Sequence, residues 1–115
     1  MSAATRQAIA AAANTVTGIS CTPYHRQSLK PGDGCVRLAN RKRSATGFGY
    51  VDTWQVWVAL AQNVADAEKW LDDHTTELAD ALEAEISVQS ITPAQLQIGA
   101  GAAVNGVIVE GAREG

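Results

Sequence analysis

The chain has 115 residues, of which 46% are hydrophobic and 18% charged, and its formal net charge is −3 at pH 7. This composition is typical of one globular domain, residues 1–115, and excludes a disordered chain. No apolar run reaches the roughly 20 residues that a membrane span needs. Much of the apolar share is alanine, which buries little area, so subunit contacts would help to stabilise the fold.

The alanine-rich N-terminus contains Arg6 and Asn14 and has neither the charged start nor the leucine-rich centre of a secretion signal. We therefore expect a soluble protein of the cytoplasm. Cys21 and Cys35 are then reduced, and two buried thiols explain them better than a disulfide.

The charges of the two halves differ strongly. Residues 1–50 have seven basic residues and one acid, a net charge of +6, whereas residues 51–115 have eleven acids and two basic residues, a net charge of −9. Opposed poles suit head-to-tail contact between copies or with stacked partners. The alternative is that two solvated faces simply differ in sign.

The first part of the chain predicts a helix followed by two short strands. Alanine-rich residues 3–16 have apolar positions at helical spacing, and Gly18 would end that helix. A strand at 19–29 is confined by Pro23 to a sheet edge, because proline has no N–H to donate. A turn rich in proline and glycine then leads into a second strand at 35–40.

The segment RKRSATG, residues 41–47, is predicted to be an exposed connection. It has three adjacent cations and no large apolar side chain, so we expect it to become ordered only against a partner. Three charges without interleaved aromatic residues would bind phosphates only weakly. Contact with an acidic protein surface, or plain solvation, explains Arg41, Lys42 and Arg43 better.

Residues 50–60 have the clearest strand pattern of the chain. Large apolar side chains alternate onto one face, which Asp52 shares: Tyr50, Trp54, Val56, Val58 and Leu60. The opposite face is half polar, yet it has Trp57. Three explanations stay open for that ring: a lone exposed tryptophan, cover from the N-terminal helix, or a neighbouring subunit.

A long acidic helix is predicted from Asn63 or Asp66 to about Glu85. Its apolar stripe would pack on the apolar face of the preceding strand, and includes Val64, Leu71, Leu78 and Leu82.

Two or three further strands with glycine-rich turns are predicted to close the chain. The turn is either GAGAA at 99–103 or the Asn105–Gly106 pair. Asn-Gly is the stronger local signal, whereas a bend at 99–103 gives better-matched strands. The order helix, strands, helix, strands predicts an α+β domain: an antiparallel or mixed sheet with two helices packed on one face.

No residue pattern of a known active site is present in the sequence. Cys21, His25 and Cys35 match no common zinc spacing, and His74 precedes Glu77 where di-iron bundles have Glu before His. The glycine pairs lack the third glycine of a dinucleotide site. We therefore expect a protein that is not an enzyme, with no catalytic residue, no cofactor and no metal.

The overall layout resembles a family of phage proteins. An N-terminal helix and a glycine/proline turn precede YVDTWQVWV at 50–58, the acidic helix ADAEKWLDDHTTELADAL at 65–82 and C-terminal strands. This layout is similar to that of the tail-terminator (tail-completion) proteins of long-tailed bacteriophages, especially those of actinobacterial hosts. The resemblance covers nearly the whole chain, and its motifs are architectural rather than catalytic.

The resemblance implies a structural virion protein at the head–tail junction, assembled in the host cytoplasm. Subunits of that family form a hexameric ring that caps the tail tube, ends its polymerisation and joins it to the head-side connector. Genomic DNA passes through the lumen without specific binding, and neither a cofactor nor a membrane takes part. The implied partners are further copies of the chain, the tail-tube protein and a head-side connector or stopper protein. The alternative is another head–tail connector or adaptor, or a ring protein associated with the tail tube.

Members of that family vary so much that no invariant site carries over to this sequence. The candidate contacts with a neighbouring subunit or partner therefore come from the residues alone: Arg41, Lys42, Arg43 and Trp57.

Overall fold

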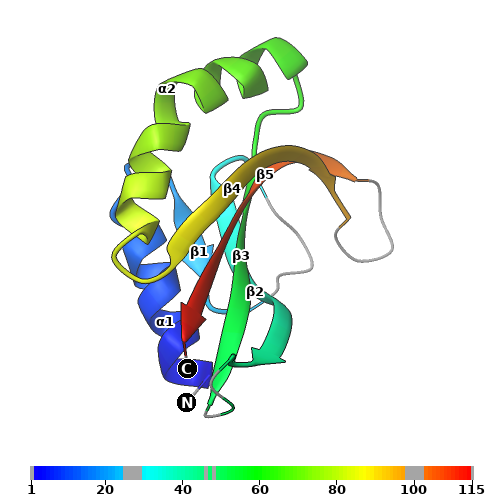
Figure 1. Cartoon of the computed structure of the whole chain (residues 1–115). Coiled ribbons are helices and arrows are strands. Elements are labelled where there is room, and N and C mark those ends of the chain that lie inside the picture. Colours follow the sequence, from blue (N-terminus) through cyan, green and yellow to red (C-terminus); the bar gives the residue numbers. More distant parts are fainter. Residues whose placement is uncertain (1, 25–29, 46, 48, 98–102, 115) are drawn as a thin grey trace.

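The computed structural model describes residues 2–24, 30–45, 47, 49–97 and 103–114. Two helices and five strands follow one another in the order helix, strands, helix, strands (Figure 1). They are α1 (Ser2–Ala13), β1 (Ser20–Thr22), β2 (Asp33–Arg43), β3 (Tyr50–Ala59), α2 (Val64–Leu82), β4 (Ser87–Leu96) and β5 (Val104–Glu114). The predicted α+β class is confirmed.

The five strands form one mixed sheet in the order β1-β2-β3-β5-β4. Only β1 and β2 pair in parallel, and the other three pairs are antiparallel. β1 is an edge strand, as predicted, and it ends at Thr22, directly before Pro23. The rest of the predicted strand includes residues 25–29, which lie outside the described residues. Pro93 lies in β4, the strand at the opposite edge of the sheet. No strand pairs with the outer side of β4, so a missing N–H costs no hydrogen bond between strands on that side.

Helix α1 ends at Ala13, three residues earlier than predicted: the N–H of Asn14 still donates to the carbonyl of Ala10, whereas those of Thr15 and Val16 donate only three residues back. The side chain of Asn14 bonds to β1. Its Nδ2 donates to the carbonyl of Cys21 at 3.0 Å, and its Oδ1 accepts from the N–H of Cys21 at 2.6 Å. Asparagine side chains compete with helical hydrogen bonds in this way. Gly18 then adopts a left-handed conformation, with φ of 89°, in the turn that leads to β1.

Residues 41–43 are exposed, as predicted, but the prediction of a connection was wrong there, because β2 continues to Arg43. Arg41, Lys42 and Arg43 pair with Asp52, Val51 and Tyr50 of β3. Pairing with the neighbouring strand satisfies their backbone, and their long side chains reach solvent from the hairpin. Thr46 and Phe48, in the connection itself, lie outside the described residues.

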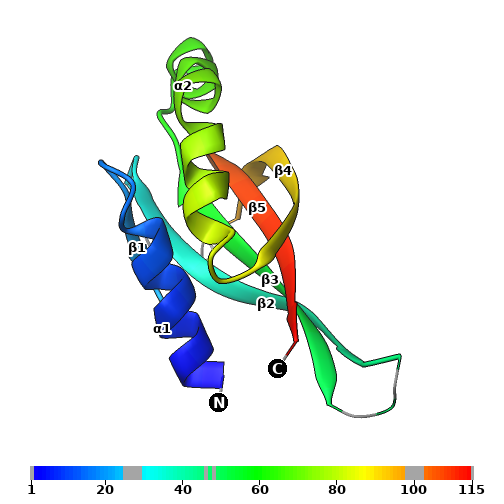
Figure 2. The ribbon, with the colours of Figure 1, turned by 60° about the vertical axis from the view of Figure 1, so that its left-hand side comes forward.

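The hairpin of β2 and β3 extends beyond both helices, towards the lower right of Figure 2. A register shift between Leu38 and Asn40 marks the place where this projecting part begins, and such bulges increase the local twist of a strand pair. We call its paired residues, 38–43 and 50–53, the arm.

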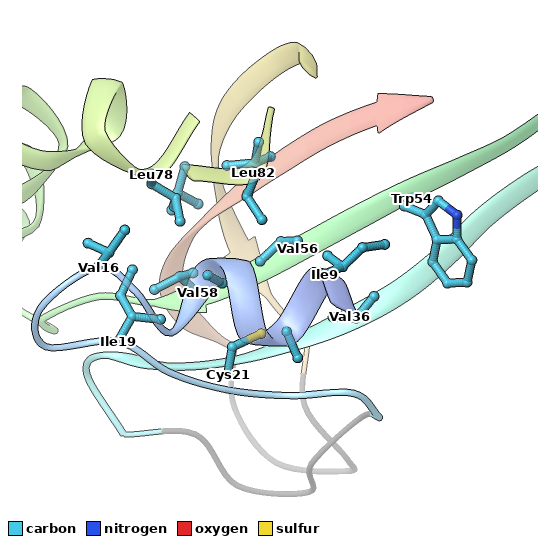
Figure 3. Close-up of a cluster of buried hydrophobic side chains, with 14 of the residues drawn as sticks. Ile9, Val16, Ile19, Cys21, Val36, Trp54, Val56, Val58, Leu78 and Leu82 are labelled. Atoms are coloured by element: carbon cyan, nitrogen blue, oxygen red, sulfur yellow. The ribbon is translucent and has the colours of Figure 1, made fainter. Parts of the chain in front are cut away.

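One apolar cluster joins both helices to the same face of the sheet (Figure 3). Strand β3 contributes the fully buried Trp54, Val56 and Val58, which confirms its predicted alternation. The other strands and the helices contribute Val36, Val107, Val109, Ile9, Ala13, Leu78 and Leu82. Two predicted core residues are exposed instead: Tyr50 lies on the arm, and Val64 at the start of α2.

The connection between β4 and β5 lies between Leu96 and Val104, which favours the predicted bend at 99–103 over the Asn-Gly turn. Residues 98–102 lie outside the described residues. Asn105 and Gly106 are inside β5, where the Asn105 amide donates to the carbonyls of Ala61 and Gln62. Long-range bonds therefore override the local turn preference of this pair.

Candidate functional site

The arm combines cations with an aromatic ring and one buried carboxylate. Asp52 is only 6% exposed, and its Oδ1 lies 3.0 Å from Nε of Arg41. The guanidinium groups of Arg41 and Arg43 lie 4.5 Å and 5.5 Å from the centre of the Tyr50 ring, within the range of cation–π attraction. Arg41 is thus held by its own hairpin, whereas Lys42 and Arg43 give the arm its outward positive charge.

The same arm exposes apolar surface. Leu38 is 38% exposed and Tyr50 is 39% exposed. In the register of the hairpin, Leu38 lies opposite Trp54. Tyr50, four residues before Trp54 in β3, lies on the same face of the strand. The arm therefore presents both positive charge and apolar area to solvent.

Trp57 lies on the sheet face opposite both helices, which we call the open face. Helix α1 packs in the cluster on the Trp54 side, so it does not cover the Trp57 ring, and that explanation is excluded. The ring is half-buried and packs beside Ala59, Leu96 and Ile108.

Polar groups from three strands fix the Trp57 ring in place. The Arg37 guanidinium lies 4.6 Å from the ring centre. The indole Nε1 donates to Oε1 of Gln55 at 3.0 Å, and Nε2 of Gln55 donates to Oε1 of Glu110 at 3.2 Å. These contacts orient the half-buried indole and restrict its side-chain freedom.

A groove of about 630 Å³ separates the N-terminal half of α2 from β4 and the start of β5. Helix α2 changes direction along its length (Figure 1), and Thr75 donates its hydroxyl hydrogen to the carbonyl of Leu71 at 2.7 Å, a bond that often bends helices. In the first half of the helix, Ala67 still packs in the core cluster, whereas Val64 is exposed beside the groove. The groove is lined by Val64, Glu68, Leu71, Asp72, Pro93 and Ala94, among others.

The groove has an apolar floor and an acidic side. Val64 is 63% exposed, the largest value among the large hydrophobic residues of the described part. Neither Glu68 nor Asp72 forms an ion pair with a basic residue within the described ranges. The sequence analysis assigned the whole apolar stripe of α2 to the core. Only the bend shows that its first turns line a groove.

Arm and groove lie at opposite ends of β3. Tyr50 begins the strand in the arm, and Leu60, directly after its last residue, lines the groove. Ten extended residues span roughly 30 Å at about 3.3 Å per residue. The arm therefore does not reach the groove of its own chain.

The predicted contact residues do not form one site. Arg41, Lys42 and Arg43 lie together in the arm, whereas Trp57 lies on the open face further along the hairpin. The groove and the contact of Arg37 with Trp57 were not predicted, because both depend on strand register and helix bending, which the sequence pattern does not specify.

The residues that were considered for metal binding are separated. Cys21 and Cys35 are buried and are not joined by a disulfide, as expected, and His25 lies outside the described residues. His74 and Glu77 contact each other at 3.4 Å on an exposed part of α2. Among the described residues, no three His, Cys, Asp or Glu side chains are grouped to hold a metal ion.

No helix in the described ranges is long and apolar enough to cross a bilayer. No protein-family profile matches the sequence, and no curated protein matches it significantly. The surfaces themselves thus carry the functional argument: a basic arm, an acidic groove, and an open face with an oriented tryptophan.

Proposed function

We propose that the protein is a structural subunit of a phage tail, of the tail-terminator type. Copies of it close into a hexameric ring, which caps the tail tube, ends its polymerisation and presents a surface to the head-side connector. The ring is part of the virion at the head–tail junction and forms in the host cytoplasm. DNA passes through its lumen, and the subunit catalyses nothing.

The observation that carries this proposal is the open face with Trp57. Both helices pack on the other side of the sheet, so neither helix covers the half-buried Trp57, and we place a lateral contact at this ring. Tryptophan is enriched among the residues that dominate binding energy, above all when it lies in a well-packed setting. Here Arg37, Gln55 and Ile108 supply that setting.

The motif resemblance and the charge layout support the same proposal. The chain has the helix, hairpin, acidic helix and strand order on which the resemblance to tail terminators rests. Its positive arm and acidic helix suit a head-to-tail contact, and such contacts generate rings when the rotation between copies closes.

The test is sizing of the purified chain by analytical ultracentrifugation over a wide concentration range, with negative-stain imaging of the largest species. We expect closed rings of six that bind to the ends of purified tail tubes and prevent their further growth. A chain that stays monomeric at every concentration, with tubes present or absent, contradicts the proposal. Rings that leave tube growth unchanged but bind head-side proteins indicate the alternative, another connector or adaptor of the junction.

A further inference from the structure

We propose that the arm of one copy docks in the groove of the next copy, which brings the positive charges of Lys42 and Arg43, on the two faces of the hairpin, close to the carboxylates of Glu68 and Asp72. This inference rests on the proposed function in one respect, namely that copies of the chain assemble with each other. It adds a second contact to the one proposed for the open face, and it assigns an occupant to the groove.

Charge is the first argument. The arm has three adjacent cations, of which only Arg41 is matched by a carboxylate of its own hairpin. The groove has two carboxylates, Glu68 and Asp72, without an ion pair to any basic side chain of the described part. Glu68 and Asp72 are exposed, so their charges would attract the cations of an approaching arm, most strongly at low salt.

Apolar complementarity is the second argument. The groove exposes Val64 and is otherwise lined largely by aliphatic side chains, Leu60, Leu71 and Pro93 among them. Its volume of about 630 Å³ lies within the usual range of binding pockets, roughly 300–1,000 Å³. Leu38 and Tyr50 are the exposed apolar residues of the arm, so docking would remove apolar surface on both sides from water.

Geometry is the third argument, and it selects a second copy as the occupant. The two surfaces lie about 30 Å apart at opposite ends of β3, so one chain does not satisfy its own groove. Two different surfaces of the same chain that fit each other make a head-to-tail contact, which repeats from copy to copy. This is the contact that a ring requires.

The experiment exchanges the charges of the two surfaces. One variant, Lys42→Glu with Arg43→Glu, reverses the arm, and another, Glu68→Lys with Asp72→Lys, reverses the groove. Arg41 is left unchanged because it pairs with the buried Asp52. The matched control, Asp73→Lys with Asp80→Lys, makes the same charge change on exposed residues of α2 that do not line the groove.

Each variant is sized by ultracentrifugation at low and at high salt, after circular dichroism has shown that it is folded. We expect each reversed variant alone to need about tenfold more protein, or more, for half-assembly, because like charges then face each other. An equimolar mixture of the two should assemble at wild-type concentrations, as should the chain with all four substitutions. The control should assemble like the wild type.

The experiment distinguishes a wrong docking contact from a wrong ring. If both reversed variants assemble into rings like the wild type, the docking is wrong, and the ring itself stands. If both reversed variants assemble less well and their mixture does not recover assembly, the pairing of arm and groove is also wrong, because a general charge effect then explains the weaker assembly. If the wild type stays monomeric at every concentration and salt level, both the docking and the ring are wrong.

Discussion

Arg6 shows how a single side chain organises the end of the core that lies nearest the arm. Its Nη1 donates to the carbonyls of Pro23 and Val36 at 3.1 Å and 3.0 Å. Its guanidinium also lies 5.3 Å from the centre of the Trp54 ring. Arg6 thereby connects helix α1 to the edge of β2 just beyond the end of β1. The Trp54 ring is enclosed beneath the Arg6 guanidinium.

Trp54 is the largest fully buried side chain of the described part, with 1% of its surface exposed. Trp54→Ala should lower the free energy of unfolding by about 3–5 kcal/mol, because the lost packing adds to the cavity that remains. The measurement is urea denaturation followed by circular dichroism. The control is Tyr50→Ala, on the same strand face but exposed, which should cost at most about 1 kcal/mol. Near-normal stability of Trp54→Ala would refute the assignment of this ring to the core.

Arg41 differs from its two basic neighbours, although the sequence presents all three alike. Arg41→Ser leaves the buried Asp52 carboxylate without its cation and should lower the free energy of unfolding by about 1–3 kcal/mol. Lys42→Ser and Arg43→Ser, on the exposed hairpin, should stay within about 0.5 kcal/mol of the wild type. Thermal and urea denaturation compare the three. Equal stability of all three variants would show that the ion pair contributes nothing to the fold.

At the scale of elements, the first turns of α2 shape the groove, and Asn63 determines where they begin. Its Oδ1 accepts from the N–H of Asp66 at 3.2 Å, so the helix begins at Val64, within the range predicted. Asp66 adds a negative charge near the positive end of the helix dipole.

Asn63→Ala should lower the free energy of unfolding by about 1 kcal/mol, the usual cost of a lost N-cap. Asn63→Asp keeps a cap acceptor and should cost little. Urea denaturation measures stability, and amide exchange of residues 64–67 shows whether the loss is confined to the first turn. A first turn that exchanges as slowly in Asn63→Ala as in the wild type would contradict a capping role.

At the scale of the whole molecule, the distribution of surfaces follows from a two-layer architecture. Both helices lie on one face of the sheet, β1 is too short to cover β2, and the hairpin extends past α1 (Figure 2). The arm and the groove therefore lie at opposite ends of β3, and Trp57 lies on the sheet face that neither helix covers.

Trp57→Ala should leave the secondary structure unchanged and weaken the ring by about 2 kcal/mol or more per contact, as expected for an interface hot spot. Ultracentrifugation at matched concentrations compares it with the wild type. Ile91→Ala, which removes an exposed apolar side chain of β4 outside the arm, the groove and the open face, is the control and should assemble normally. An oligomer distribution that Trp57→Ala does not change would exclude this face from the ring contact.

The sequence by itself determined the elements whose patterns are set by local periodicity. The alternation of residues 50–60 predicts which side chains of β3 are buried, because successive side chains of a strand point to opposite faces. The apolar spacing of α2 and the edge position of the strand before Pro23 follow from equally local rules.

Only the tertiary structure decided where local signals compete with distant contacts. Asn105–Gly106 is strand rather than turn because the Asn105 amide bonds to carbonyls 44 and 43 residues away. Gly106 is needed there because a Cβ would lie 2.9 Å from the carbonyl oxygen of Val58. Residues 41–43 are strand because β3 pairs with them. Val64 is exposed because α2 bends away from the sheet (Figure 1). Arm, groove and open face are all products of such long-range packing, which composition and periodicity do not specify.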